Sequence, residues 1–393
     1  MEYISYRVEN DSLYLQPLGR VDSSNAAVLE KEIFDVLKAH PGLTPVLDCD
    51  ALEYISSAGL RVVLRLRKES AELRVINVSS DVYEIFEMTG FTEMIPVEKG
   101  YRKLSVDGCE VIGRGANGVV YRLDPDTIIK VYLSPDSLAD IHKERELARR
   151  AFVLGVPTAI PYDVVKVGDS YGSVFELLNA KSFAKILAEE PERLDEIAAM
   201  NVELLKTIHG TEVRPEDMPD MRAVALDWVA FLKDYLPAES WEKLHELVVA
   251  VPVNHHMMHG DYHVKNVMVQ NGEALLIDMD TLTQGDPVFE FASIYNAYVG
   301  FLELDHSVAQ DFLGISYEMA TELWKKTLRL YFDTTDERLL QAVEDKAALI
   351  GYVRLLRRTI RRHGLETEEG RKLIAFYKER IETLLGRVDT LSL

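Results

Sequence analysis

One short segment near residue 260 restricts the fold of this chain more than any other feature. Residues His259–Asn266 read His-Gly-Asp-Tyr-His-Val-Lys-Asn, and Asp278 follows twelve residues after the asparagine. Two apolar, β-rich runs between them flank an Asn-Gly pair, which is a strong signal for a β-hairpin. Because a hairpin folds the chain back on itself, Asp261, Asn266 and Asp278 are expected to lie close together.

Three oxygen-bearing side chains at one point suit phosphoryl transfer. That reaction needs an acceptor for the proton of the attacking hydroxyl, together with oxygen ligands that hold Mg²⁺ against the nucleotide phosphates. An aspartate, an asparagine five residues later and a second aspartate after the turn supply such groups. A metal site alone does not make a kinase, so a phosphate-binding loop and a lysine should precede it.

A glycine-rich loop lies upstream. Gly113, Gly115 and Gly118 fit the pattern G-x-G-x-x-G, with a strand-like run before them and a second strand expected from Val119 to Leu123. This context excludes a dinucleotide-binding Rossmann unit, in which a helix follows the glycines. Glycines at these positions let backbone amides close over phosphates.

The next apolar run carries Lys130, which needs an acidic partner on a helix. The helix expected over about 137–154 offers two candidates, Glu144 and Glu146. Helical periodicity favours Glu144, because it shares a face with apolar residues, whereas Glu146 lies with arginines and reads as a surface acid. The residues that share the face of Glu144 are Leu147, Ala148, Ala151 and Phe152.

From about Leu104 to its C-terminus the chain resembles the aminoglycoside phosphotransferase and choline kinase-like group of the protein-kinase-like superfamily. The resemblance rests on the H-G-D-x-x-x-x-N loop, on Ile277–Asp280, and on Gly285-Asp286-Pro287 followed by Glu290-Phe291-Ala292. Eukaryotic-type protein kinases usually have arginine at the position of Gly260, and this difference favours the small-molecule branch.

The resemblance implies a role for each polar side chain. Asp261 would be the catalytic base, and Asn266 and Asp278 would bind Mg²⁺. Lys130 would orient the α- and β-phosphates of ATP, and Asp280 would assist the metal.

The resemblance also implies a hinge between two lobes. Tyr171–Leu178 reads as an apolar strand that runs into a less regular segment. The backbone at Glu176 and Leu178 is therefore expected to bind adenine.

The first hundred residues read as a separate unit, in which alternating strands and helices indicate a sheet with helices on a face. The first helix is expected to bury a stripe of Val28, Leu29, Ile33, Val36 and Leu37. Strands are expected at 13–15, 45–48 and 73–78, and helices at 26–37, 57–70 and 80–88.

This region resembles a STAS domain, the fold of anti-sigma factor antagonists. The matching residues are Gly19–Ser23 and Leu47–Asp48, which lead to Leu52–Arg61. In that family a partner kinase phosphorylates a serine at a helix N-terminus, which corresponds to Ser57. A helix N-terminus favours phosphate, but either Ser56 or Ser57 serving simply as a helix cap is the alternative.

Length and composition suit two or three domains with buried cores, since the chain has 393 residues and is 47% hydrophobic. We expect an α/β STAS-like domain over residues 1–100, followed by an α+β, bilobal kinase-like domain. Its N-lobe would span 101–178 and its mostly helical C-lobe 179–393. The join at about 98–102 is too short for free tumbling.

Charge and cysteine content limit partners and location. The formal net charge of −21 argues against nucleic-acid binding and suits a cationic substrate. Only Cys49 and Cys109 occur, so there is no disulfide framework. No apolar run approaches the length of a membrane span and no signal peptide is seen, so we expect a cytoplasmic protein without a membrane partner.

The leading hypothesis is an ATP- and Mg²⁺-dependent transferase acting on a hydroxyl of a small molecule. A second is a partner-switching protein whose STAS-like domain binds an anti-sigma factor and whose kinase-like domain is a protein serine kinase or nucleotide sensor. A third is a pseudokinase scaffold. Candidate substrate-lining residues are Asp227, Trp228, Tyr262 and Tyr298.

The last helices carry several arginines beside apolar residues. Most are expected to form a solvated face near acidic residues, with lining of a cleft or docking of the first domain as alternatives. They are Arg354, Arg357, Arg358, Arg361 and Arg362.

Overall fold

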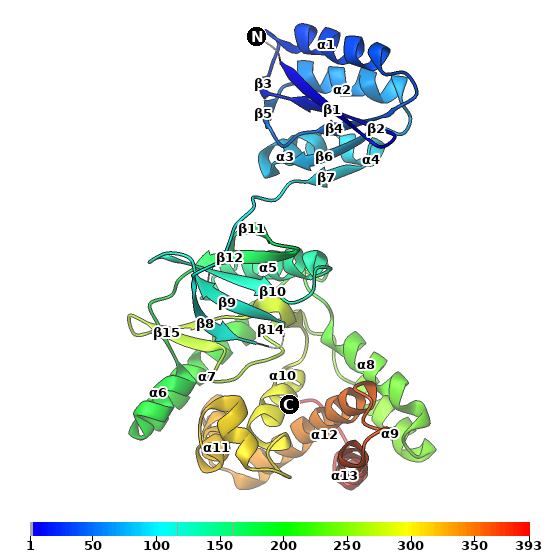
Figure 1. Ribbon diagram of the computed structural model, residues 1–393. Helices are drawn as coiled ribbons and strands as arrows, with labels where there is room; N and C mark the ends of the chain where they lie inside the picture. Colours follow the sequence, from blue (N-terminus) through cyan, green and yellow to red (C-terminus); the bar gives the residue numbers. More distant parts are fainter. Residues whose placement is uncertain (1–2, 116, 160) are drawn as a thin grey trace. The chain divides into compact units, whose positions relative to one another are not determined.

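The computed structural model describes residues 3–115, 117–159 and 161–393 (Figure 1). The chain divides into two compact units. The first runs to Ser105 and includes 164–169, and the second contains 106–163 and 170–393. Ala116 of the glycine loop lies outside the described residues, as do residues 1–2.

The first unit is a mixed sheet with helices. Its main sheet has the strand order β1-β2-β4-β6-β7, in which only the β1–β2 pair of these neighbours is antiparallel. These strands are β1 (Ile4–Glu9), β2 (Ser12–Pro17), β4 (Thr44–Asp48), β6 (Arg74–Val78) and β7 (Val97–Lys99). A separate parallel pair is formed by β3 (Gly19–Val21) and β5 (Leu52–Ile55). The helices are α1 (Ala26–Ala39), α2 (Ser57–Glu69), α3 (Ser80–Met88) and α4 (Phe91–Met94).

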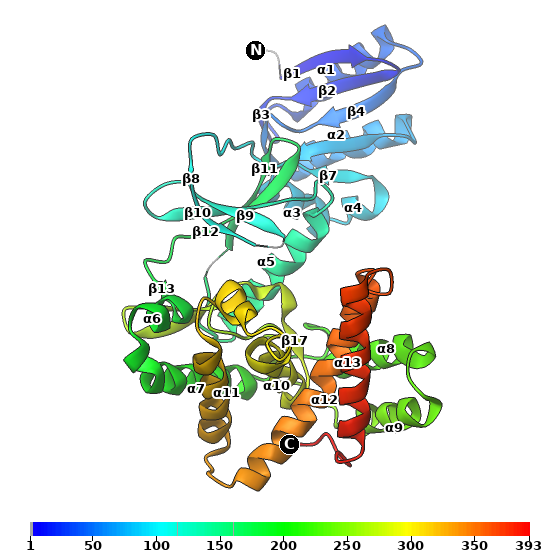
Figure 2. The same ribbon diagram turned by 60° about the horizontal axis from the view of Figure 1, so that its bottom comes forward.

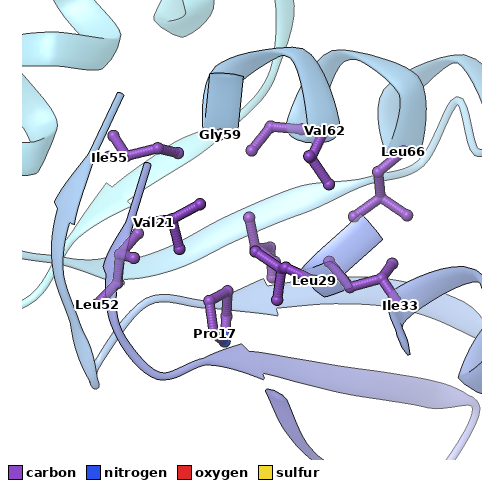
Figure 3. A pocket seen from close by; sticks show the side chains of 11 residues that line it. Pro17, Val21, Leu29, Ile33, Leu52, Ile55, Gly59, Val62 and Leu66 are labelled. Carbon is purple, nitrogen blue, oxygen red and sulfur yellow. The ribbon is translucent and has the colours of Figure 1, made fainter. Parts of the chain in front are cut away.

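Helix α2 packs tightly over the β3–β5 pair. Figure 3 shows a small apolar cavity bordered by α1, α2 and the neighbouring strands. A Cβ atom added at Gly59 would lie 2.6 Å from Ile55 Cγ1 and 2.7 Å from Val21 Cγ1. The first turn of α2 therefore needs glycine, and this close packing fixes the position of the helix N-terminus at Ser57.

Two expectations for this unit were wrong in detail. Val28 was placed on the buried stripe of α1 but is 45% exposed, because the helix buries a narrower face made by Ala26, Leu29 and Ile33. The join expected at 98–102 begins later, since Val97–Lys99 pairs with β6 as the last strand of the sheet.

The second unit begins with a sheet of order β11-β12-β10-β9-β8, whose β8–β9, β9–β10 and β10–β12 pairs are antiparallel. Helix α5 (Leu138–Val153) follows β10 in sequence and contacts β12. The strands are β8 (Glu110–Arg114), β9 (Gly118–Arg122), β10 (Thr127–Tyr132), β11 (Pro161–Val167) and β12 (Ser170–Glu176).

The rest of the unit is mostly helical, and one apolar core runs through it. Figure 2 shows α12 and α13 beside α8 and α9, and the pairs α8–α12 and α9–α13 are in contact. The helices are α6 (Phe183–Glu189), α7 (Leu194–Gly210), α8 (Met221–Phe231), α9 (Ala238–Val249), α10 (Pro287–Tyr295), α11 (Tyr317–Phe332), α12 (Glu337–Arg361) and α13 (Glu368–Leu385). Short 3₁₀ turns lie at Pro191–Arg193, Leu232–Asp234 and Met279–Thr281, and π-helical turns at Asn296–Gly300 and Ala309–Leu313.

The predicted hairpin is confirmed. Strand β15 (Val267–Gln270) pairs antiparallel with β16 (Glu273–Leu276), and β13 (Lys181–Ser182) flanks β15. Asn271 and Gly272 have φ angles of 53° and 86°, which suits the two central positions of a type I′ turn. A further short pair is formed by β14 (Met257–Met258) and β17 (Thr283–Gln284). Strand β14 immediately precedes His259–Asn266, the segment called the catalytic loop below.

No helix within 3–115, 117–159 and 161–393 is both long and apolar enough to cross a membrane.

Candidate active site

Lys130 on β10 contacts two carboxylates. Its Nζ lies 3.0 Å from Glu144 Oε1 and 2.8 Å from Asp278 Oδ1. Glu144 is only 4% exposed and also accepts a hydrogen bond from the Tyr132 hydroxyl. Burial alone would lower the pKa of Lys130, but the two carboxylates raise it above its ordinary value, so the ammonium form is retained.

The second candidate glutamate lies elsewhere. Glu146 is half exposed and pairs with Arg150 at 2.8 Å, one helical turn further along α5. The structure therefore brings Lys130 to Glu144 and not to Glu146. Phe152, expected on the same buried face as Glu144, is 48% exposed, because the buried face of α5 ends with Ala151.

Gly260 in the catalytic-loop segment has a conformation that requires glycine. Its φ angle is +80°, and a Cβ atom there would lie 2.5 Å from the Thr281 carbonyl oxygen. Glu290, fully buried in α10, accepts hydrogen bonds from the backbone N–H groups of His259 and Gly260. The Ser293 hydroxyl donates to the Gly260 carbonyl at 2.8 Å. Glu290 and Ser293 of α10 thus hold the loop in place.

His259 is a buried support of this loop. Its Nδ1 accepts from the Asp261 N–H at 3.3 Å, and its Nε2 lies 3.2 Å from the Ile277 carbonyl. These partners fit the tautomer that carries its proton on Nε2. The Thr281 hydroxyl donates to the His259 carbonyl at 2.7 Å, so the ring and backbone of His259 connect the loop to the segment around Asp278.

Asp261 presents a partly exposed carboxylate beside two cationic or basic side chains. Its Oδ2 lies 3.6 Å from His263 Nε2. Burial alone would raise the pKa of Asp261, but His263 and Arg354 lower it to about 2. The carboxylate is therefore ionised at neutral pH, although a group this acidic is a weak proton acceptor.

The acids around Asp278 form a group that fits a divalent cation. One carboxylate oxygen from each of Glu144, Asp278 and Asp280 can be chosen so that all lie within 4.8 Å of one another. Burial, Asp278 and Glu144 raise the pKa of Asp280 to about 7, so a bound cation would relieve the repulsion between these charges. Oxygen ligands are those that Mg²⁺ prefers.

A backbone hydrogen bond places Asn266 next to this group of acids. Its carbonyl accepts from the Ile277 N–H at 3.0 Å, next to Asp278. Its Nδ2 donates to the Asp261 carbonyl at 3.0 Å, which leaves the amide oxygen for a ligand. Asn266 and Asp278, the two expected ligands, are thus on neighbouring backbone segments.

Steric packing requires glycine at only one of the three predicted positions of the glycine loop. Gly118 must be glycine for packing, because a Cβ atom would lie 2.6 Å from the Val131 carbonyl. At Gly113 and Gly115 a Cβ atom would make only ordinary contacts. Glu176 ends β12, and Leu178 follows it outside the strand.

Two tyrosines expected to line a substrate pocket are fully buried instead. The Tyr262 hydroxyl donates to the Asn201 carbonyl at 2.7 Å, and the Tyr298 hydroxyl accepts from the Val264 N–H at 3.0 Å. Both side chains hold the loop in place, so that part of the expectation was wrong.

Arg354 on α12 is a functional candidate that periodicity did not single out. Its Nη1 donates to the Gly260 carbonyl at 3.1 Å and to Ser293 Oγ at 3.0 Å. It is half-buried, and not part of a fully solvated face. The sequence signal that could have identified Arg354 was its position between two apolar residues, Val353 and Leu355, both of which are buried.

Ser57 in the first unit is exposed at the first residue of α2. The helix cap is Ser56, whose Oγ accepts from the Ala58 N–H at 3.2 Å. Within the part of the chain that the structure describes, the Ser57 hydroxyl has no hydrogen-bond partner. Of the two cap candidates, Ser56 therefore caps the helix, and the Ser57 hydroxyl is not needed for capping.

Comparison with known families agrees with this geometry. Residues 108–321, just over half of the chain, match the model of the phosphotransferase enzyme family, APH. The chain belongs to this family. A variant of aminoglycoside phosphotransferase APH(4)-Ia, solved as a ternary complex with AMP-PNP and hygromycin B, has a similar fold. It is 14% identical, with a TM-score of 0.50, over 71% of this phosphotransferase and 93% of that chain.

The first unit of this phosphotransferase is a STAS domain, since residues 3–104 match that family model. It is 44% identical over 84 residues to the putative anti-sigma factor antagonist BtrV of Bordetella bronchiseptica, covering 20% of this chain and 71% of that protein. It is 26% identical over 94 residues to an anti-sigma-B factor antagonist of Listeria monocytogenes, covering 23% and 82% of the two chains.

Proposed function

We propose that this protein transfers the γ-phosphoryl group of ATP to a hydroxyl group of a small molecule, in a reaction that requires Mg²⁺. The observation that carries the proposal is the position of Lys130, which contacts both Glu144 and Asp278. This arrangement joins a phosphate-binding cation to a group of metal-binding acids in a chain of the phosphotransferase family.

Each residue then has a part in binding or proton transfer. Asn266 and Asp278, assisted by Asp280, would hold Mg²⁺, which when bound neutralises charge on the phosphates. Lys130, held by Glu144, would bind the α- and β-phosphates. In the same proposal Gly113, Gly115 and Gly118 cover the phosphates, and the backbone at Glu176 and Leu178 binds adenine.

Asp261 would orient the acceptor hydroxyl towards the γ-phosphorus. The bond between the γ-phosphorus and the β,γ-bridging oxygen breaks, and a bond forms from the acceptor oxygen to that phosphorus. The hydroxyl proton passes to Asp261 and then to solvent, and ADP leaves. Since the transition state of such transfers is loose, orientation by a weakly basic carboxylate is sufficient.

The domain organisation follows the same proposal. A STAS regulatory domain over 1–100 precedes an N-lobe over 101–178 and a C-lobe over 179–393. The catalytic groups come from both lobes, with Lys130 and Glu144 in the first and Asp261 in the second.

The test is transfer of labelled phosphate. The full-length protein is incubated with γ-labelled ATP, Mg²⁺ and a metabolite extract, and small molecules and protein are separated. We expect a labelled metabolite whose yield falls by about 10²–10⁴-fold in Asp261→Asn and is unchanged in Glu146→Gln, which alters an acid outside the site. Absence of label on any molecule would favour the pseudokinase scaffold.

A second candidate function is partner switching, with the STAS domain binding an anti-sigma factor and the kinase domain phosphorylating protein serine. The free hydroxyl of Ser57 at an exposed helix N-terminus favours it, together with the similarity to anti-sigma factor antagonists. It predicts label on the protein in the same experiment, lost in Ser57→Ala and retained in Ser56→Ala. Unlabelled protein beside a labelled metabolite would count against it.

A further inference from the structure

Five arginines in the last turns of α12 and at its C-terminal end form no ion pair in the described residues. None of Arg354, Arg357, Arg358, Arg361 and Arg362 forms an ion pair within the described ranges of the chain. Elsewhere in the same helical region, Arg329 pairs with Glu337 at 2.7 Å and Arg380 with Glu303 at 3.1 Å. The chain as a whole is acidic, with a formal net charge of −21.

One of these arginines contacts the catalytic loop, and a second lies one helical turn away from it on α12. Arg354 reaches the backbone of Gly260, next to Asp261, and uses only its Nη1 for the two hydrogen bonds there. Its Nη2 and Nε donors are left for other partners. Arg358 is one helical turn further and exposed, so it lies on the same face of α12 as Arg354.

Aromatic rings position these guanidinium groups without neutralising them. Arg354 Cζ lies 5.8 Å from the ring centroid of Trp228, and Arg358 Cζ lies 5.2 Å from that of Phe301. Figure 2 shows that α8, which carries Trp228, runs beside α12. Cation–π contacts of this kind leave the N–H donors at the guanidinium edge for an oxyanion.

A row of ring contacts connects Phe301, the neighbour of Arg358, to the side chain beside Asp261. The Phe301 ring contacts Phe312, with ring centroids 5.9 Å apart, and Phe312 contacts the His263 ring at 5.1 Å. His263 is the neighbour of the Asp261 carboxylate. Arg354 thus contacts the loop directly, and the Arg358 side chain is connected to it through Phe301, Phe312 and His263.

We propose that the acceptor is an alcohol that also carries a phosphate or carboxylate group, and that Arg354 and Arg358 bind this group while Asp261 orients the hydroxyl. The assignment rests on the proposed phosphotransfer function and names the substrate class of that site. It differs from the cationic acceptor that the net charge suggested, because Arg354 and Arg358, two arginines without ion pairs in the described residues, lie on the α12 side of the site.

Binding of simple anions tests the assignment without turnover. Inorganic phosphate and, separately, acetate are titrated by calorimetry into full-length protein saturated with AMP-PNP and Mg²⁺, so that the nucleotide site is occupied. We expect binding of at least one anion, weakened about 10- to 100-fold in Arg358→Gln, as for loss of a charge-assisted hydrogen bond. Arg338→Gln, in the exposed first turn of α12, is the matched control and should bind as the unaltered protein does.

The two anions separate the two chemical sources, since preference for phosphate indicates a phosphorylated alcohol and preference for acetate a carboxylated one. Absence of binding of both anions, or equal binding by Arg358→Gln, overturns the assignment. Labelling of metabolites from pools fractionated by charge then checks the proposed function by itself. Label from a neutral or cationic pool would uphold phosphotransfer and reject the anionic acceptor, whereas no label from any pool would count against phosphotransfer.

Discussion

Lys130 Nζ lies 2.8 Å from Asp278 Oδ1, so the lysine expected to bind phosphates is paired with an acid expected to bind the metal. The same ammonium group is held from the other side by Glu144 at 3.0 Å. Binding of Mg²⁺ and nucleotide would draw Asp278 towards the metal, and Glu144 would then be the group that keeps Lys130 in place.

Replacement of Glu144 should therefore change the requirement for Mg²⁺. In Glu144→Gln, Lys130 keeps only Asp278 as a charged partner, and that ion pair competes with the metal. We expect the Mg²⁺ concentration for half-maximal activity to rise about tenfold, as for loss of a charge-assisted interaction of roughly 1.4 kcal/mol. A Mg²⁺ titration at fixed ATP measures this, with Glu146→Gln as the control. An unchanged Mg²⁺ requirement in Glu144→Gln would contradict the role given to Glu144.

Gly260→Ala should disable the catalytic loop. The new Cβ atom would combine an unfavourable φ of +80° with a contact of 2.5 Å to the Thr281 carbonyl. We expect unfolding free energy to fall by more than about 1 kcal/mol and activity to be lost. Gly272→Ala is the matched control, because it shares a positive φ of 86° but has open space around the new atom. Thermal unfolding and turnover of both variants are measured, and equal losses would show that steric contact at Thr281 is unimportant.

Sequence reasoning succeeded where one local pattern determines the structure. The Asn-Gly pair is sufficient to place a tight turn, so the hairpin at 267–276 was predictable. Helical periodicity was sufficient to place Glu144 rather than Glu146 on the buried face of α5. In both cases the decisive interactions lie within a few residues along the chain.

It failed where the partner of a side chain is distant in sequence. A pattern shows that Tyr262 and Tyr298 are aromatic but not that their hydroxyls bond to backbone groups far along the chain or within the loop. Arg354 reads as a surface arginine until α12 is packed against α10, where its partner Ser293 lies. Such contacts depend on tertiary packing, which the periodicity of a local sequence does not reveal.

Glu290→Gln should weaken the support beneath the loop. The carboxylate is fully buried and accepts the backbone N–H groups of His259 and Gly260. A glutamine of the same size offers one oxygen and turns an amide N–H₂ group towards these donors. We expect a loss of about 1–3 kcal/mol in unfolding free energy together with lower kcat, measured by denaturant unfolding and steady-state kinetics.

Asp286→Asn is the comparison for Glu290→Gln. It keeps the oxygen that accepts from the Val288 N–H at the start of α10, and asparagine caps helices as well as aspartate. A change within about 0.5 kcal/mol is expected there. A Glu290→Gln protein as stable and active as the Asp286→Asn protein would show that the buried charge is not needed.

Asp48 should make the stability of the STAS domain depend on acid pH. It is 3% exposed, and its carboxylate accepts from Arg7 Nη1 at 2.8 Å and Asn77 Nδ2 at 2.9 Å. Burial alone would raise the pKa of Asp48, but the hydrogen bonds from Asn77 and Arg7 hold it below its ordinary value. A depressed pKa means that the unfolded state binds the proton more readily. The stabilisation is therefore complete above about pH 4, near the unfolded value of 3.9, and is lost as the pH falls through the folded pKa.

Asp48→Asn tests this dependence. We expect the variant to be less stable at neutral pH by about 1–3 kcal/mol, because a charged acceptor is lost from a buried site. Below about pH 4 the difference should shrink, since the unfolded state of the unaltered protein then binds a proton that the folded Asp48, with its lower pKa, does not. Hydrogen exchange of peptides from β2 and β4, corrected for the intrinsic pH dependence, reports the opening of this domain within the full-length protein. Asp11→Asn, which replaces an exposed acid next to β2, should show neither effect.

The contradicting outcome is a constant difference in stability between Asp48→Asn and the unaltered protein from pH 7 to pH 3. It would mean that Asp48 does not titrate below its usual pKa. The neutral carboxyl group would then bond Arg7 and Asn77 as well as the charged carboxylate does.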